Sequence, residues 1–253
     1  MTHVAPAATA HSWRPPAPIA PRGTIVVLPG RGEHGLVYER FGRRISADGY
    51  VVHALDTTPE QDSADILLAV TGVLGAAPAA PVVLVGSDTG ALQVLNAAAR
   101  AGDEVPLAGL VLAGTAPTSG GETALDWDAE LAARTSCPTH RQTLAEDAEF
   151  ERGRLADAIP AHLLPTEVTP VVPVLLLHGA ADPLTPLEEA RALARRLPYA
   201  DFGVVRDGVH DVLNDASHRT TAAAVVQWLE RLRADDDLRP ILTLEPLEPR
   251  EQH

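Results

Sequence analysis

Three side chains suited to acid, base or nucleophilic chemistry each follow a strand-like segment of the chain. Asp88 follows the β-branched segment 81–85, Asp182 follows segment 172–178, and His210 follows segment 201–205. In an open α/β sheet, ligands bind outside the carboxyl ends of the strands, so loops that follow strands meet at one edge. The order is that of a nucleophile, then an acid, then a histidine.

The proposed nucleophile occupies the centre of the turn Gly86-Ser87-Asp88-Thr89-Gly90. A sharp turn from strand to helix strains its central residue, and small neighbours let the helix pack close to the strand. A carboxylate at this apex is suited to displacing a leaving group from an sp³ carbon, which leaves an alkyl ester on Asp88. Two alternatives remain open: ester hydrolysis with Asp88 as a general base or through an anhydride, and a site without activity in which Asp88 only caps the next helix.

The elements that must position these residues alternate regularly between strand and helix. Strands are predicted at 24–28, 50–55, 81–85, 107–113, 172–178 and 201–205, and helices at 37–49, 61–75, 91–102, 186–197 and 217–233. Strands that are apolar on both faces suit a mostly parallel sheet covered by helices on each side. The pattern therefore predicts an α/β fold with a doubly wound sheet.

The remaining segments define the domain organisation. Residues 115–171 contain helical segments and no convincing strand, which indicates a short helical cap inserted into a domain spanning 23–233. Residues 1–22 are rich in Pro and Ala and are expected to form an extended arm rather than a packed element. Residues 234–253 are expected to form an acidic tail.

Composition narrows the classes of partner and cofactor. The formal net charge is −14, which argues against binding to nucleic acid or to an anionic membrane surface. The single cysteine excludes an intramolecular disulfide, and no segment is apolar over the length that a bilayer requires. The ten histidines show no close ligand spacing, so we expect no metal and no cofactor. A cytoplasmic protein with a small-molecule substrate is the expectation.

The motifs resemble the α/β-hydrolase superfamily over roughly residues 23–233. The similarity rests on LPGRGEHGLVYERFGRRISADGY, GSDTGA, LLLHGAADPLTP and GVHDVLND. The first is similar to the oxyanion loop of the monoacylglycerol-lipase and lysophospholipase branch, with Pro29 in place of that branch's leading histidine. The resemblance implies a triad of Asp88, Asp182 and His210, and an oxyanion hole formed by the backbone N–H groups of Arg31 and Thr89.

The aspartate elbow itself resembles that of haloalkane dehalogenases and epoxide hydrolases. The resemblance implies that His210, oriented by Asp182, activates water to hydrolyse the alkyl ester. The cap segment contains no tyrosine, whereas epoxide hydrolases use two, and Thr89 stands where dehalogenases often have tryptophan. The remaining donors to a leaving group are Trp127, His140 and Arg141 of the cap.

We therefore expect a cofactor-independent hydrolase of a small, largely apolar substrate. The alternatives are a lipase-like or esterase-like ester hydrolase, and a hydrolase-like protein that binds a small molecule and is either inactive or a non-hydrolytic catalyst with Asp88 as a proton-transfer base.

Overall fold

The computed structural model describes residues 9–102, 105–118, 125–164, 169–235 and 237–243, and the sheet within these ranges has seven strands in the order β1-β3-β2-β4-β5-β6-β7. The strands are β1 (Ala10–Trp13), β2 (Thr24–Leu28), β3 (Val51–Leu55), β4 (Val82–Asp88), β5 (Leu107–Thr115), β6 (Val174–Gly179) and β7 (Ala200–Val205). All neighbouring pairs are parallel except β1 with β3. The expected mostly parallel α/β sheet is confirmed.

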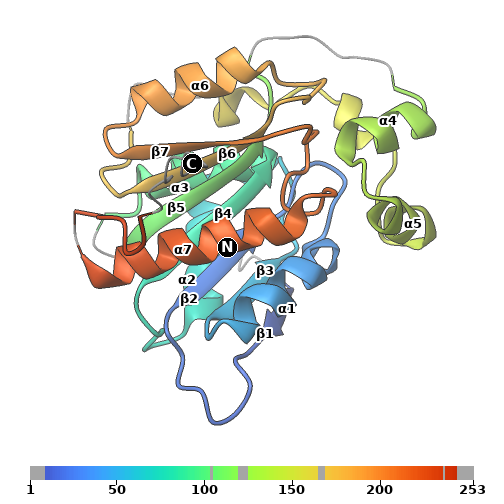
Figure 1. Cartoon of the computed structure of the whole chain (residues 1–253). Helices are drawn as coiled ribbons and strands as arrows, with labels where there is room; N and C mark the ends of the chain where they lie inside the picture. Colours follow the sequence, from blue (N-terminus) through green and yellow to red (C-terminus); the bar gives the residue numbers. More distant parts are fainter. Residues whose placement is uncertain (1–8, 103–104, 119–124, 165–168, 236, 244–253) are drawn as a thin grey trace, which may run out of the picture.

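Helices cover both faces of the sheet (Figure 1). Buried side chains of α1 (Glu39–Ala47) and α7 (His218–Ala234) belong to one apolar core, and those of α2 (Ser63–Leu74), α3 (Thr89–Ala98) and α6 (Leu187–Arg196) belong to the other. Alternate residues of a strand point to opposite faces. In β2, Ile25 and Val27 accordingly join the first core, while Val26 and Leu28 join the second.

The expectation of an unpacked arm is wrong for residues 10–13. This segment forms β1 at the edge of the sheet, where Ala10 pairs with Leu55 and Trp13 pairs with Val52. Trp13 also packs against the core that contains α1. Four residues are too few to show a strand period in the sequence, so only pairing with β3 reveals this element. Residues 1–8 of the predicted arm lie outside the described residues.

The cap insertion is helical where it is described. It contains α4 (Trp127–Arg134), α5 (Pro138–Glu146) and the short 3-10 helices η2 (Arg154–Ala156) and η3 (Ala161–Leu163). In Figure 1, α4 and α5 stand apart from the layers that cover the sheet. Residues 119–124 and 165–168 of the predicted cap, and residues 236 and 244–253 of the predicted tail, lie outside the described residues.

None of the helices that the structure describes combines the length and the apolar composition that crossing a bilayer requires.

Candidate active site

Asp88 ends β4 and directly precedes the first residue of α3. Its backbone has φ 50° and ψ −120°, a conformation that L-residues rarely adopt and that raises the side chain at the apex of the turn. The following helix crosses close behind it, since a Cβ added to Gly90 would lie 2.4 Å from the carbonyl oxygen of Leu28. The Asp88 side chain makes no capping hydrogen bond to α3, so the interpretation of Asp88 as a helix cap is wrong.

The fold brings Asp88, Asp182 and His210 together. Nε2 of His210 lies 3.1 Å from Oδ1 of Asp88, and Nδ1 of His210 lies 2.8 Å from Oδ2 of Asp182. The other Asp182 oxygen accepts hydrogen bonds from the backbone N–H groups of Leu184 and Thr185, which fixes the carboxylate plane. Asp88 and His210 are each only 2% exposed. The three side chains therefore form a buried, continuous hydrogen-bonded line.

The side chain of Arg31 lies directly on the Asp88 carboxylate. Its Nε donates to Oδ2 of Asp88 at 2.8 Å, and its Nη2 donates to Oδ1 at 2.8 Å. Its Nη1 donates to the backbone carbonyl of Asp157 in the cap at 2.7 Å. Sequence reasoning considered only the backbone of Arg31 and missed this bidentate pair. The signal was available as a cationic residue between two glycines in a loop that follows a strand.

One half of the predicted oxyanion hole faces Asp88. The backbone N–H of Arg31 donates to Oδ2 of Asp88 at 2.9 Å. The Thr89 hydroxyl lies 3.5 Å from the same oxygen, while the role predicted for the Thr89 backbone N–H stays a prediction. The two carboxylate oxygens thus have different surroundings. Oδ2 faces the loop that carries Arg31, and Oδ1 faces His210.

Two buried carboxylates and two buried cations balance each other in this site. For Asp88, burial favours the neutral acid, but the Arg31 charge and the bonds from His210 and Arg31 outweigh it and hold its pKa well below the usual range. Burial likewise opposes the charged form of His210, yet the Asp182 and Asp88 carboxylates raise its pKa to about 10. At neutral pH, Asp88 is therefore an anion and His210 an imidazolium.

A second buried ionic cluster fixes the loop that carries Arg31. Arg134 of α4 donates to Glu33 at 3.0 Å, to Glu130 at 2.8 Å and to the backbone carbonyl of Arg31 at 2.7 Å. Glu33 also accepts the backbone N–H of Gly30 at 3.0 Å. The Arg134 side chain is 1% exposed. The cap and the loop are consequently joined by a network that is inaccessible to solvent.

The three cap residues predicted as donors are engaged elsewhere. Trp127 packs against Phe150 with ring centroids 5.7 Å apart, and Arg141 donates through Nε to the carbonyl of Thr135. His140 is buried, with Nε2 at 3.2 Å from a carboxylate oxygen of Asp211. None of the three is among the described residues that line the cavity next to Arg31.

That cavity has a volume of about 620 Å³ and lies between the cap and the ends of the strands. Arg31 forms part of its wall, and most of the other lining residues are apolar: Pro117, Leu125, Ala129, Ala132, Ala133, Leu155, Ala156, Ala158, Ile159, Ala181, Pro183, Leu184 and Val209. Asp88 and His210 are not in this lining. The guanidinium therefore separates the cavity from the carboxylate.

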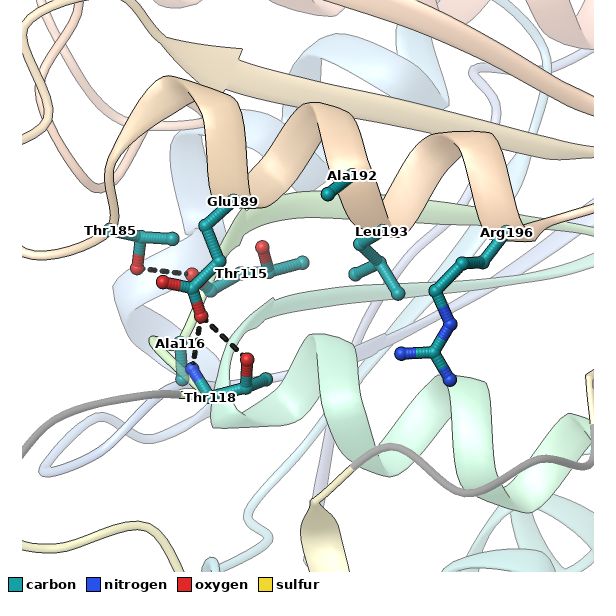
Figure 2. Close-up of a pocket in the computed structure, with 8 residues that line it drawn as sticks. All are labelled: Thr115, Ala116, Thr118, Thr185, Glu189, Ala192, Leu193 and Arg196. Atoms are coloured by element: carbon teal, nitrogen blue, oxygen red, sulfur yellow. Dashed lines mark hydrogen bonds between the residues drawn. The ribbon is translucent and has the colours of Figure 1, made fainter.

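A smaller cavity of about 100 Å³ lies against α6, and its lining contains none of the triad residues (Figure 2). Figure 2 shows Thr185 and Glu189 reaching toward the end of β5. The Thr185 hydroxyl donates to the carbonyl of Thr115 at 2.7 Å, and Glu189 accepts from Thr118 at 2.6 Å. These bonds tie the loop that carries Asp182 and the start of α6 to the segment that ends β5, so the region holds Asp182 in place.

Comparisons with known proteins agree with this architecture. A family profile described as "TAP-like protein" matches residues 157–239, the part of the chain that carries Asp182 and His210. The monoacylglycerol lipase of Paleococcus ferrophilus superposes with a TM-score of 0.70 at 20% identity, over 89% of this chain and 99% of that chain.

Two further structures are similar to a comparable degree. A soluble variant of the Saccharomyces cerevisiae monoglyceride lipase gives a TM-score of 0.69 at 16% identity, over 88% of this chain and 91% of that one. A thermostable carboxyl esterase from Bacillus coagulans gives 0.69 at 18% identity, over 90% and 94%. The chain has the α/β-hydrolase fold.

Proposed function

We propose that this chain, on its α/β-hydrolase fold, is a hydrolase in which Asp88 attacks an sp³ carbon and His210 then directs water onto the resulting ester. The observation that carries the proposal is the division of the Asp88 carboxylate between two sets of partners. Oδ1 faces Nε2 of His210, whereas Oδ2 accepts the backbone N–H of Arg31. This arrangement supports Oδ1 as the attacking atom and Oδ2 as the future ester carbonyl oxygen.

The charge state of Asp88 supports displacement rather than base catalysis. A carboxylate with a lowered pKa is a weak base, because it binds a proton poorly. It is nevertheless an anion at every physiological pH, which is the state that nucleophilic displacement requires. The same depressed pKa counts against Asp88 as the group that deprotonates water in direct ester hydrolysis.

The charge state of His210 suits a leaving group that needs a proton. In the resting site His210 is an imidazolium, because the Asp182 and Asp88 carboxylates outweigh the opposing effect of burial and raise its pKa to about 10. When Asp88 opens an epoxide, the C–O bond breaks as the new Asp88–carbon bond forms, and the alkoxide takes the proton of His210. The products of this step are a hydroxyalkyl ester and a neutral imidazole.

The same step prepares His210 for the hydrolytic half of the reaction. Alkylation removes the negative charge of Asp88, which lies 3.1 Å from Nε2, so the pKa of His210 falls. Neutral His210 accepts a proton from water, and the hydroxide attacks the ester carbonyl while the Arg31 N–H stabilises the oxyanion. The ester bond breaks to release the diol, and Asp88 and the imidazolium are regenerated. The sum is epoxide plus water giving diol.

Arg31 has two assigned functions in this scheme. In the resting state its guanidinium covers Asp88, so it must move aside before a substrate carbon reaches Oδ1. A guanidinium that turns into the adjoining cavity becomes a donor for the developing charge on the leaving oxygen. Arg31 would thereby replace the cap tyrosines, which residues 115–171 do not contain.

The cavity indicates the substrate class. Its volume of about 620 Å³ and its mostly alanine, leucine and proline walls fit a small, largely apolar molecule. Arg31 and Asp157 are the charged residues in its wall, and Arg31 supplies the polar anchor next to Asp88.

A second candidate is hydrolysis of carboxylic esters. The similarity to solved monoacylglycerol lipases and a carboxyl esterase favours it, together with the lipase-like loop around Arg31. Attack of Asp88 on an ester carbonyl would break the bond to the alcohol, which leaves with the proton of His210, and would give an anhydride. Water would then attack the Asp88 carbon of that anhydride, which releases the carboxylic acid and returns a proton to His210. The Asp88 carboxylate would again carry oxygen from water, but the enzyme would be acylated rather than alkylated.

Trapping the intermediate separates the candidates. The probes are styrene oxide, 1-bromobutane and p-nitrophenyl butyrate, each incubated with wild type, Asp88→Asn and His210→Gln. His210→Gln is expected to accumulate an alkyl adduct on the peptide containing Asp88, detected by mass spectrometry with 1-bromobutane, because bromide leaves without the proton that an epoxide oxygen takes from His210. Single turnover of wild type in ¹⁸O water should place label in the Asp88 carboxylate.

The remaining outcomes count against the proposal. A butyryl adduct instead of an alkyl adduct would support the ester-hydrolase candidate. Turnover with label only in the product, or full activity of Asp88→Asn, would exclude a covalent aspartate. Binding of these probes without any turnover by wild type would favour the non-hydrolytic alternative.

A further inference from the structure

Three metal-ligating side chains that are distant in the sequence meet at the edge of the sheet. His11 lies on β1, His34 directly precedes the 3-10 helix η1 (Gly35–Tyr38), and Asp56 directly follows β3. One potential ligand atom from each residue lies within 4.8 Å of the other two. They meet because β1 pairs antiparallel with β3, which places His11 opposite Ala54 and close to Asp56.

We infer that His11, His34 and Asp56 form a binding site for a divalent transition-metal ion, with Zn²⁺ as the best match. Two imidazole nitrogens and one carboxylate oxygen are a donor set that Zn²⁺ and other first-row divalent transition-metal ions accept. Ca²⁺ and Mg²⁺ instead prefer oxygen ligands alone. Bonds of about 2.0–2.2 Å would bring tetrahedral donors to roughly 3.4 Å from each other, so the donor atoms, which lie within 4.8 Å of one another, need to approach by at most about 1.4 Å per pair.

The hydrogen bonding of His34 is that expected of a ligand. Its Nε2 lies 2.8 Å from Oδ2 of Asp147, and its Nδ1 is buried without a hydrogen-bond partner among the described residues. An Nε2–H donated to the Asp147 carboxylate leaves the lone pair on Nδ1. A carboxylate that holds the opposite ring nitrogen is the usual support of a metal-bound histidine.

A cavity also lies beside two of these residues. It has a volume of about 160 Å³, and its lining includes His34, Asp56, Thr57 and Glu149. The Thr57 hydroxyl is buried and has no hydrogen-bond partner among the described residues, and Glu149 Oε2 lies 4.0 Å from Nδ1 of His34. Buried polar atoms are seldom left unpaired. A metal ion with a bound water and the Glu149 carboxylate would satisfy them.

The cation that also lines this cavity is neutralised elsewhere. Arg154 pairs with Glu60 at 3.4 Å, with Glu151 at 3.2 Å and with Asp157 at 2.7 Å. Its charge is therefore compensated, so it presents little repulsion to a divalent ion.

An ion here would connect β1 to the loop that supplies the Arg31 N–H. Of the three ligands, Asp56 already accepts the backbone N–H of Gly35 at 2.7 Å, and His34 lies three residues from Arg31. Metal binding would thus restrain the arm, the loop and the end of β3 together. This inference is independent of the reaction that Asp88 performs.

The test is metal titration of the full chain carrying no affinity tag, after removal of bound ions with a chelator. Isothermal calorimetry with Zn²⁺, and visible absorption with Co²⁺, should show one equivalent bound and a raised Tm. His11→Gln and Asp56→Asn should each weaken Zn²⁺ binding by at least about 100-fold, and Asp147→Asn by about 10–100-fold. His162→Gln, which changes an exposed histidine of η3, is the matched control and should bind as wild type does.

Folding is checked separately by circular dichroism of each metal-free variant. His11 and Asp56 are partly exposed, so these variants should keep the metal-free Tm of wild type. Absence of Zn²⁺ binding to folded wild type would overturn the inference. Unchanged affinity in both His11→Gln and Asp56→Asn would place the ion elsewhere and overturn it as well, as would Ca²⁺ binding that is as tight as Zn²⁺ binding.

Discussion

The buried pair of Arg31 and Asp88 gives the most direct test of the electrostatics of the site. The side chains are 5% and 2% exposed, and two N–H groups of the guanidinium donate to the two carboxylate oxygens. Arg31→Met keeps much of the apolar length and removes the charge. Asp88→Asn keeps the shape and removes the opposite charge. Each single change leaves a buried charge that has lost its closest partner.

The expected magnitudes follow from this burial. Removing one partner of a buried ion pair costs about 3–5 kcal/mol. Both single variants should fall near the lower end, at about 3 kcal/mol. In Arg31→Met, Asp88 keeps its bonds to the backbone N–H of residue 31 and to His210, and in Asp88→Asn, Arg31 keeps its bond to the Asp157 carbonyl. The double variant leaves no orphaned charge at this pair, so it should cost about 3 kcal/mol rather than the sum of about 6. The coupling energy is therefore about 3 kcal/mol.

The assay is urea unfolding at pH 7 of wild type, both single variants and the double variant. In a chain of this size, each kcal/mol moves Tm by about 2–4 °C, so thermal scans of the single variants should shift by about 6–12 °C. Because the pKa of Asp88 is lowered in the folded state, its carboxylate stabilises the fold fully above the ordinary aspartate pKa. This stabilisation is lost as the pH falls through the folded-state pKa of Asp88. The coupling should thus be equal at pH 7 and pH 6. Additive effects within about 0.5 kcal/mol would refute the reasoning.

Three further outcomes are expected. Because the folded-state pKa of His210 is raised to about 10, its stabilising contribution is complete below its unfolded pKa of about 6.5 and is lost as the pH rises toward 10. The free energy of unfolding of wild type should decline over that range relative to His210→Gln, and an identical decline in both would contradict the assignment. Gly90→Ala places a Cβ 2.4 Å from the Leu28 carbonyl and should prevent stable folding, whereas Gly72→Ala, in an open part of α2, should stabilise by about 1 kcal/mol in urea unfolding. Equal effects of the two glycine changes would exclude close packing at the elbow. Arg134→Met should cost about 3–5 kcal/mol by orphaning buried carboxylates, and a cost below 1 kcal/mol would show that the network is not closed to solvent.

Local patterns were sufficient for the elements that repeat along the chain. Apolar β-branched segments followed by helical ones predicted the six parallel strands, because each such strand must be apolar on both faces. Gly86 and Gly90 marked the elbow for an equally local reason. The backbone of the turn packs so closely at these two positions that a Cβ atom would clash with neighbouring backbone atoms. The order of Asp88, Asp182 and His210 predicted a cluster, and the structure brings these three side chains together.

Contacts between distant segments were decided only by the tertiary structure. The direction of the Arg31 side chain depends on the cap carbonyl of Asp157 and on the elbow, 126 and 57 residues away, so no local pattern encodes it. The strand that carries His11 becomes visible only through its antiparallel pairing with β3. Ligand spacing in the sequence therefore gave no metal signal. Side-chain clusters of this kind form because the sheet brings the ends of non-adjacent segments to one edge, a consequence of strand order rather than of sequence distance.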